Sequence, residues 1–478
     1  MTHRKNTQAA LTQSINSWQM AALSLPYMGA AFFFGSMNVV QGIYAKYFGL
    51  SLTTLAAVLL LSRLFDAVSD PLIGFFSDRY RTRTGTRKPF VLVGGLFLIV
   101  CSYFLFVPPD NVSVAYFTFW MLAFYMAFTI FSLSIRAWAS EVTSSSEERA
   151  KIFSIKAFLS NAGGLLFFLV PFLPLFTTTE ITPETLKVSI ILGAIVILPA
   201  LYCALRYVPN GPPSAPSHKA ANKIKSSAIK DILGAFKGNK PFQMLALAYS
   251  FTALGLGMHF GLFFIFVDGY LGQGELYAQI AVVGIGLGFL LIPLTYKLIV
   301  LLGKKKVWLI SMGLLMFSVL YASQLVPEES AFIPLLIMKC FIVFYSMSTV
   351  IIVASMLSET IDYGRINDRN ERTGTYYAVY SFLYKAEAAI GISLGLAIAG
   401  LLGFDATATS HSEQAVFAIH MTVSWIPFVI FFIGSYLIYL IPLDERRSAI
   451  VARRLAGRAL RESAQSKQDS PRESLQAS

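Results

Sequence analysis

Long apolar stretches alternate with short polar segments along the whole chain, and each apolar stretch is long enough to cross a bilayer as a helix. The pattern predicts twelve helices, at residues 20–47, 53–77, 89–108, 114–139, 152–176, 187–207, 241–268, 276–300, 306–325, 331–357, 375–402 and 415–442. Only helices and closed barrels satisfy their backbone hydrogen bonds in lipid. We therefore predict an all-α membrane protein with twelve transmembrane helices.

The polar segments between the predicted helices alternate in charge. One set is rich in lysine and arginine and includes residues 79–88, 304–306, 365–372 and 219–237, whereas the other set has few basic residues besides Lys46 and Lys187. Cytoplasmic loops carry the excess of basic residues, so both chain ends and the middle segment are expected in the cytoplasm. We expect a multi-pass protein of a plasma membrane, such as a bacterial inner membrane.

Composition excludes several other classes of protein. The 478 residues are 55% hydrophobic and 13% charged, against about 25% charged residues in soluble proteins. The net charge of +12 does not indicate nucleic-acid binding, because the basic residues are confined to segments between apolar stretches. The three cysteines, Cys101, Cys203 and Cys340, all lie in apolar stretches and show no disulfide or metal-binding spacing.

The polar segments also lack enzyme motifs. They contain no Walker-type loop and no HExxH, CxxC or GxSxG sequence. We therefore expect no enzyme activity and no cofactor. Without a nucleotide site, the energy for transport is expected to come from an ion gradient.

Residues 209–240 are expected to divide the chain into two halves. Several prolines and then a run of lysines make this segment typical of a flexible cytoplasmic linker. A weak internal repeat supports the division, since residues 85–88 resemble residues 303–306. We expect a cytoplasmic tail at 1–19, six-helix bundles at 20–208 and 241–442, and a basic, partly disordered cytoplasmic tail at 443–478.

The second predicted helix contains three ionisable side chains. Arg63, Asp66 and Asp70 are spaced so that they share one helical face. Charges at membrane depth are costly and usually mark function. Pro71 cannot donate a backbone hydrogen bond, so it leaves a carbonyl near the two carboxylates, and this oxygen environment suits Na⁺ or a proton. The alternative is a purely structural ion pair between Arg63 and one carboxylate.

Further ionisable residues lie within other predicted helices. Arg136 and Lys156 lie near the ends of two helices joined by one cytoplasmic loop, so they can face one cavity. Lys385 lies well inside its helix and needs an internal anion, for which Asp66 or Asp70 is the natural partner.

The remaining intramembrane charges carry weaker expectations. His259 is expected to be a hydrogen-bonded interior residue, and Asp268 is expected to be hydrated at the membrane surface. Glu387 points away from Lys385 by helical geometry. Lys339 receives no specific role beyond reaching the membrane surface or pairing with an acid of a neighbouring helix.

Several motifs together resemble the glycoside–pentoside–hexuronide:cation symporters of the major facilitator superfamily. The most specific is Arg63-Leu-Phe-Asp66-Ala-Val-Ser-Asp70-Pro71-Leu-Ile-Gly74. Supporting matches are the basic loop from Arg79 to Phe90, Ala139-Ser-Glu141-Val-Thr143, Asp362-Tyr363-Gly364 and Arg372-Thr-Gly374. The resemblance spans residues 20–442 and implies two six-helix bundles that work by alternating access.

The resemblance also implies roles for individual residues. Asp66 and Asp70 match aspartates that coordinate Na⁺, Li⁺ or H⁺, and they are metal ligands only if Na⁺ is the coupling ion. Lys385 matches a lysine linked to the cation and sugar sites, and cation binding is expected to free Lys385 or Arg63 from pairing. Residues expected to act in gating at the cytoplasmic loops are Arg87, Lys88, Asp362 and Arg372.

Departures from the family pattern bear on the solute. The acids that bind sugar in the first and fourth helices fall at Ala30 and Ser132, and Arg136 replaces an aromatic residue. Lys156 falls where a sugar carrier of the family has an arginine near the sugar. This change of sign predicts an acidic solute such as a hexuronide, with Arg136, Lys156 and Ser132 as substrate-binding residues.

We therefore expect a secondary active transporter that carries a sugar, glycoside or hexuronide together with Na⁺ or H⁺. The alternatives are a carrier of lysophospholipid-like or other amphiphiles, an exporter, and an uncoupled facilitator. The expected partners are the solute, a monovalent cation and membrane lipid, with no nucleic acid and no obligate protein partner.

Overall fold

The computed structural model describes residues 15–143, 145–211, 239–327, 330–367, 373–408 and 410–442, together with 447, 450, 451, 453 and 454. Eleven helices in these ranges are long and apolar enough to cross a membrane, and Ala386–Leu401 is a shorter apolar helix. The predicted all-α membrane fold is confirmed. The predicted linker and the two predicted tails lie largely outside the described residues.

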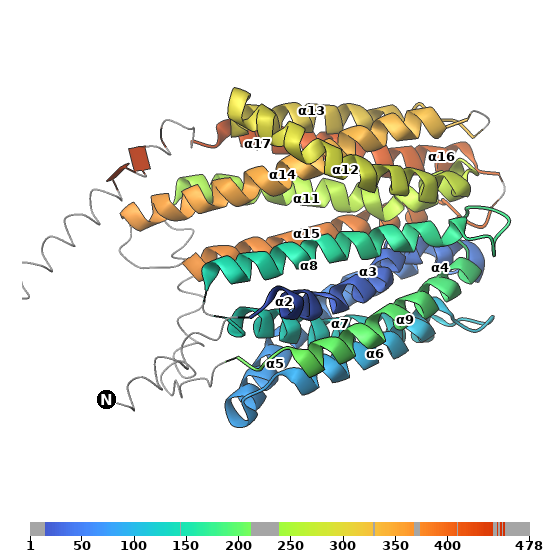
Figure 1. The fold of residues 1–478 in the computed structure, drawn as a ribbon. Coiled ribbons are helices and arrows are strands. Elements are labelled where there is room, and N and C mark those ends of the chain that lie inside the picture. The colour runs from blue at the N-terminus through green and yellow to red at the C-terminus, as the bar shows by residue number, and fades with distance from the viewer. Residues whose placement is uncertain are drawn as a thin grey trace, which may run out of the picture.

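The helices of the two halves lie side by side in one bundle (Figure 1). The first half contains α2 (Ser17–Ser24), α3 (Pro26–Met37), α4 (Val40–Phe48), α5 (Leu52–Thr84), α6 (Lys88–Phe106), α7 (Val114–Glu141), α8 (Ser146–Leu169), η1 (Val170–Phe172) and α9 (Pro183–Tyr207). The second contains α11 (Lys240–Ile265), η2 (Phe266–Tyr270), α12 (Gly274–Leu302), α13 (Lys304–Ala322), α14 (Phe332–Asn367), α15 (Thr373–Leu401), α16 (Glu413–His420), η3 (Met421–Trp425) and α17 (Ile426–Leu440).

Local side-chain chemistry sets many of the helix ends. The hydroxyls of Ser51, Ser113 and Thr182 each accept a hydrogen bond from a backbone N–H of the first helical turn. Gly85 ends α5 with a φ of 76°, a left-handed conformation that favours glycine. The predicted boundaries are therefore close to the observed ones for most helices.

The first predicted helix, at residues 20–47, is not continuous. Pro26 begins α3, and the chain leaves the α-helical pattern at Asn38 and Val39 before α4 begins. The backbone N–H groups of Asn38 and Val39 instead donate to carbonyls three residues earlier, at distances of 3.2 Å. An interruption of this kind inside a membrane is expected only where it lines a cavity or is buried in protein.

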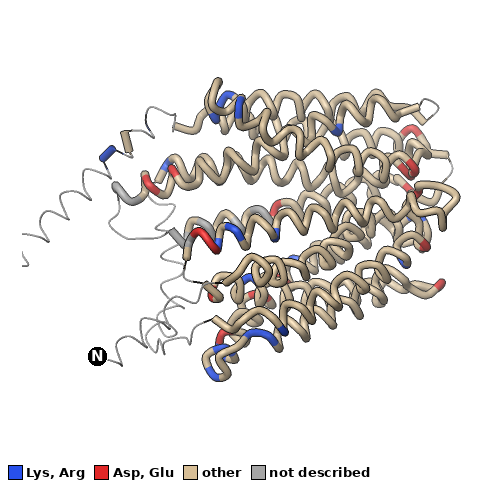
Figure 2. The backbone as a smooth tube through the Cα atoms, in the orientation of Figure 1, with Lys and Arg blue, Asp and Glu red and all other residues tan. Residues whose placement is uncertain are grey.

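Most basic residues at the helix ends lie at one end of the bundle, which we call the basic end (Figure 2). It is defined by the connections at residues 85–87 and 303, and it is the end that the positive-inside rule predicts to face the cytoplasm. Lys46, Glu180 and Asp268 lie at the other end, which we call the opposite end. The two ends differ in how the halves are joined.

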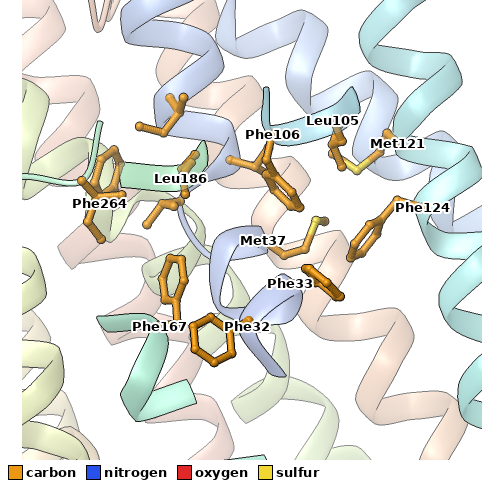
Figure 3. Packing of buried hydrophobic residues seen from close by; sticks show 14 of the residues in the cluster. Phe32, Phe33, Met37, Leu105, Phe106, Met121, Phe124, Phe167, Leu186 and Phe264 are labelled. Atoms are coloured by element: carbon orange, nitrogen blue, oxygen red, sulfur yellow. The ribbon is translucent and has the colours of Figure 1, made fainter. Parts of the chain in front are cut away.

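Buried apolar residues form two clusters. The larger cluster includes most of the first half, and residues of the second half around η2 also belong to it. Phe264 of α11 packs in this cluster with Phe32, Phe33 and Phe167 nearby (Figure 3). The smaller cluster contains only residues of the second half, among them Phe242 and Tyr376 near the basic end. The halves therefore share a core at the opposite end and have separate cores at the basic end.

Glycines allow several helix backbones to approach closely. A Cβ added at Gly257 of α11 would lie 2.0 Å from the carbonyl oxygen of Ala388 in α15, and one added at Gly163 of α8 would lie 2.1 Å from the carbonyl oxygen of Met28. Small residues at such crossings are a common basis for helix packing in membranes. Lipid tails are as apolar as the side chains, so moving an apolar side chain from lipid into a helix interface stabilises the protein little.

This packing makes a testable prediction. Gly257→Ala is expected to destabilise the protein by about 1–3 kcal/mol, because the methyl group forces α11 and α15 apart. Thermal unfolding of the purified protein in detergent measures the change. Gly313→Ala on α13 is the matched control, since an added Cβ there meets nothing within 4 Å. Equal melting temperatures for the two variants would contradict this account of the crossing.

Candidate functional site

The acidic pair of α5 faces α7. Arg63 Nη1 donates to Asp66 Oδ2 at 2.9 Å, and the Arg63 guanidinium carbon lies 4.2 Å from the centre of the Tyr125 ring. Asp70 Oδ1 accepts a hydrogen bond of 2.9 Å from Thr129 Oγ1. The structure thus brings the three charged residues together with a hydroxyl and an aromatic ring of α7, which spacing along the sequence could not identify.

The arrangement contains oxygen atoms of the kind that bind monovalent cations. Two carboxylates and the Thr129 hydroxyl lie on facing helices, and Pro71 inside α5 cannot donate to the carbonyl one turn before it. Oxygen ligands of this kind suit Na⁺, and a carboxylate alone suits a proton. In the described part of the chain, no three His, Cys, Asp or Glu side chains gather as a metal-binding cluster.

Two other predicted site residues lie in α15 or next to it in the chain: Lys385 is part of this helix, and Arg372 directly precedes it. The helix α15 packs along α5. The helix that carries Lys385 therefore lies beside the helix of Asp66 and Asp70. The side chain of Lys385 and the whole of Arg372 lie outside the described residues.

A cavity of about 350 Å³ opens between α3, α7 and α8. Its wall includes Ala30, one of the two positions where a sugar-binding acid was expected from the family pattern and is missing. The polar groups around it come from Tyr27, Asn38, Ser160 and Asn161. Phe128 lines the same cavity, and it directly precedes Thr129, so one helix contacts both the acidic pair and the cavity.

The three predicted substrate-binding residues lie around this cavity but not in its wall. Lys156 Nζ lies 4.2 Å from the centre of the Tyr27 ring, and Arg136 is close enough to act electrostatically on both Lys156 and the Tyr27 hydroxyl. They form a basic cluster between the cavity and the basic end. Ser132 is buried, with 5% of its surface exposed.

A second cavity, of about 260 Å³, lies between the halves. Asn38 and Phe168 of the first half line it, and they also line the first cavity. The second half contributes Phe260, Tyr277 and Lys339, among others. The break between α3 and α4 therefore lines both cavities, which accounts for an interruption at membrane depth.

An ion cluster joins the two halves at the opposite end. Lys46 Nζ lies 2.8 Å from Glu180 Oε1 and 2.8 Å from Asp268 Oδ1. Burial opposes ionisation of Glu180, but the hydrogen bond from Lys46, the positive charge of Lys46 and hydrogen bonds from Tyr47 and Asp268 together outweigh it and hold the pKa of Glu180 below its usual range. The prediction of a hydrated Asp268 was wrong, because its side chain is only 3% exposed. The signal for this cluster was Lys46, a rare basic residue on that side of the membrane.

The loop residues at the basic end are bound within their own half. Arg87 donates to Glu141 at 2.8–3.1 Å, to Asp78 at 2.6 Å and to Ser77 at 2.8 Å. Lys88 Nζ donates to the Leu205 carbonyl at 2.7 Å.

The second half has a corresponding ion pair at the basic end. Lys304 of α13 binds Glu359 of α14, and the predicted gating residue Asp362 lies half-buried one turn further along α14. The ion pairs that Arg87 and Lys304 form with Glu141 and Glu359 at the basic end each stay within one half, whereas the Lys46 cluster connects both halves.

Comparison with known proteins identifies the group to which this architecture is similar. Residues 20–445 match the family model described as MFS/sugar transport protein. The chain is 25% identical over 429 residues to an uncharacterized symporter, YnaJ, of Bacillus subtilis, covering 87% of this chain and 89% of that protein. It is 22% identical to a glucuronide carrier protein homolog of Escherichia coli, covering 88% of this chain and 89% of that one.

Two further similarities are partial or concern the fold alone. A putative glycoside/cation symporter, YagG, of Escherichia coli is 32% identical over 133 residues, which are 27% of this chain and 29% of that protein. The crystal structure of the nucleoside transporter NupG superposes with a TM-score of 0.61 at 12% identity, over 88% of this chain and 99% of that chain.

The ion cluster at the opposite end predicts a conformational effect. Lys46→Met or Asp268→Asn is expected to shift the equilibrium toward opening at that end by about 1–3 kcal/mol, because it leaves a charged partner unsatisfied. Reaction of Asn38→Cys with a membrane-impermeant thiol reagent added from that side, with the native cysteines replaced, measures the opening.

Two controls make this measurement decisive. Lys187→Met removes an exposed charge near the same end and is expected to leave labelling unchanged. The double variant Lys46→Asp with Asp268→Lys is expected to restore slow labelling. Faster labelling with Lys187→Met, or no faster labelling with Lys46→Met and Asp268→Asn, would refute a closing role for the cluster.

Proposed function

The chain belongs to the MFS/sugar transport protein family, and we propose that it is a symporter of the glycoside/cation type, like the relatives to which it is similar. It couples a monovalent cation at Asp66 and Asp70 to the transport of an acidic glycoside-type solute. The coupling ion is Na⁺ or H⁺. The observation that carries the proposal is the position of α7, which binds Asp70 through Thr129 and lines the cavity through Phe128.

This shared helix provides a route for coupling. A cation bound at Asp66 and Asp70 reduces their negative charge and weakens the hold of Asp66 on Arg63. The side chains of Tyr125 and Thr129 then reorient, and the wall of the neighbouring cavity moves with them. By linkage, the solute tightens cation binding by the same factor as the cation tightens solute binding, typically about 5–150-fold.

The charge around the cavity favours an acidic solute. The cavity wall contains Ala30 but no described carboxylate, and the cluster of Arg136 and Lys156 lies next to Tyr27 on the side toward the basic end. We assign this cluster to capture of the solute's carboxylate as it enters or leaves at the cytoplasmic surface. The similarity to a glucuronide carrier protein homolog supports the same class of solute.

The architecture fits transport by alternating access. The halves are joined by a common core and the Lys46 cluster at the opposite end, whereas their basic ends have separate cores. In this proposal the basic end faces the cytoplasm, and the cavity opens toward it. Rocking of one half against the other about the shared cavity then exposes it to the other side.

The cation site makes the first prediction of this proposal. Asp66→Asn or Asp70→Asn is expected to abolish gradient-driven accumulation in proteoliposomes, because the cation loses a charged ligand, while solute exchange at equal cation concentrations persists. Asp110→Asn, in an exposed loop, is the matched control. Full accumulation by either site variant would refute the assignment. Solute that only equilibrates in the unaltered protein would indicate a facilitator.

The basic cluster makes the second prediction. Arg136→Ala is expected to slow uptake of a glucuronide about tenfold or more, as expected for loss of a charge-assisted hydrogen bond, and to leave a matched neutral glucoside nearly unaffected. Uptake of both labelled solutes by proteoliposomes gives the ratio. Arg206→Ala, in the last turn of α9, is the control for loss of positive charge at the basic end. Equal losses for both solutes would contradict a role in recognising the acid.

A further inference from the structure

The second cavity contains a lysine that the functions assigned so far do not use. Lys339 lies in α14, seven residues after its first residue, and its side chain lines the cavity between the halves. Among the described residues no carboxylate lies within ion-pair distance of its ammonium group, although eight other ion pairs are formed. A lysine this deep is costly unless it binds an anion.

The packing of α12 makes room for this side chain. A Cβ added at Gly284 would lie 2.4 Å from Lys339 Cε and 2.9 Å from its Cγ. The methylene groups of Lys339 therefore lie against the backbone of α12 at Gly284. With the side chain in this position, Lys339 lines the cavity.

A buried histidine close to Lys339 does not neutralise the ammonium. His259 of α11 is completely buried, and its Nδ1 lies 2.9 Å from the Val423 carbonyl oxygen. The imidazole is close enough to Lys339 to interact with it electrostatically, but it carries no negative charge. The positive charge of Lys339 is therefore left for a ligand.

The other walls of the cavity fit a sugar ring. The ring centres of Phe168 and Phe263 lie 6.1 Å and 6.0 Å from the ring centre of Tyr277, and Phe260 also lines the space. Asn38 contributes an exposed amide at the break between α3 and α4. An acidic group, hydroxyl groups and an apolar ring face would each meet a matching surface here.

We infer that Lys339 is a second anion-binding residue for the solute, and that it binds the carboxylate of an acidic glycoside in the deep part of the transport cavity. This inference rests on the proposed function and adds a specificity-determining residue from the second half.

Lys339 and the Arg136–Lys156 cluster act at different depths. Asn38 and Phe168 line the cavity of Lys339. Asn38 lies 11 residues after Tyr27, and Phe168 lies 12 residues after Lys156. At 1.5 Å per residue this is about 16–18 Å along the helices, too far for one carboxylate to contact both sites. The cluster near the basic end acts on the anion as the solute enters or leaves at that end, and Lys339 holds it when the solute is fully bound.

The test compares 4-nitrophenyl β-D-glucuronide with 4-nitrophenyl β-D-glucoside, which differ only at C6. Equilibrium binding to the purified full-length protein is measured by calorimetry with Na⁺ present and at low pH. Lys339→Met keeps the aliphatic contact with Gly284 and removes the charge. It is expected to weaken glucuronide binding about ten- to hundredfold and to change glucoside binding less than about twofold.

Two glycine variants on α12 test whether the position of the Lys339 ammonium group determines the preference for glucuronide. Gly284→Ala is expected to displace the Lys339 side chain and to lower the preference for glucuronide in the same direction. Gly286→Ala, where an added Cβ meets nothing within 4 Å, is its matched control and is expected to keep the preference. Both substitutions favour helix formation, so loss of the folded state is not the expected cause of an effect.

The outcomes separate this inference from the proposed function. If the unaltered protein binds glucuronide and Lys339→Met binds it equally well, or loses both probes equally, the inference is wrong while symport of an acidic solute stands. If the unaltered protein binds neither probe, both are wrong. Selective loss of glucuronide in Lys339→Met and Gly284→Ala, with Lys297→Met on exposed α12 surface unchanged, supports the inference.

Discussion

A charge placed among apolar helices is costly unless another group stabilises it, and the arrangement of this protein follows from how it meets that constraint. Arg63 is held by Asp66 and the Tyr125 ring, so this pair stabilises its own charges within the first half. Lys46 is stabilised across the boundary between the halves, by Asp268. Lys46 also binds Glu180 of its own half, so the pairing with Asp268 ties the two halves together at this end, and its release allows the boundary to open.

The same constraint explains why cation and solute can influence each other. The acidic pair and the cavity lie on two sides of α7, and adjacent residues, Phe128 and Thr129, face them. A change in charge at the carboxylates therefore requires new hydrogen bonds on a helix that also shapes the solute site. Coupling over this short path needs only the repacking of side chains on one rigid helix, together with the two arrangements of the halves.

Close backbone contacts set where the halves can move. Gly42 leaves room for the ring of Phe264 from the other half, because a Cβ added at Gly42 would lie only 2.2 Å from that ring. Phe264 belongs to the core at the opposite end. At the basic end the ion pairs, such as Arg87 with Glu141, stay within one half. Each half is thus stiffened separately at the basic end, which favours movement of the halves as rigid units.

Much of this protein is determined by local sequence patterns. The length of the apolar stretches predicted the helices, the charge of the loops predicted their orientation, and the spacing of Arg63, Asp66 and Asp70 predicted a common face, since each depends on residues close together in the chain. The motif around these residues also indicated the family, which the match over residues 20–445 confirms.

The tertiary structure decided which faces of different helices meet. It alone places Thr129 against Asp70, buries Asp268 against Lys46, and lays Lys339 over Gly284. The partners in each pair are 55 or more residues apart in the chain, so no local pattern relates them. Sequence could therefore show that a charge needs a partner in the membrane, but only the packing of the helices identified the partner, or left Lys339 without a carboxylate among the described residues.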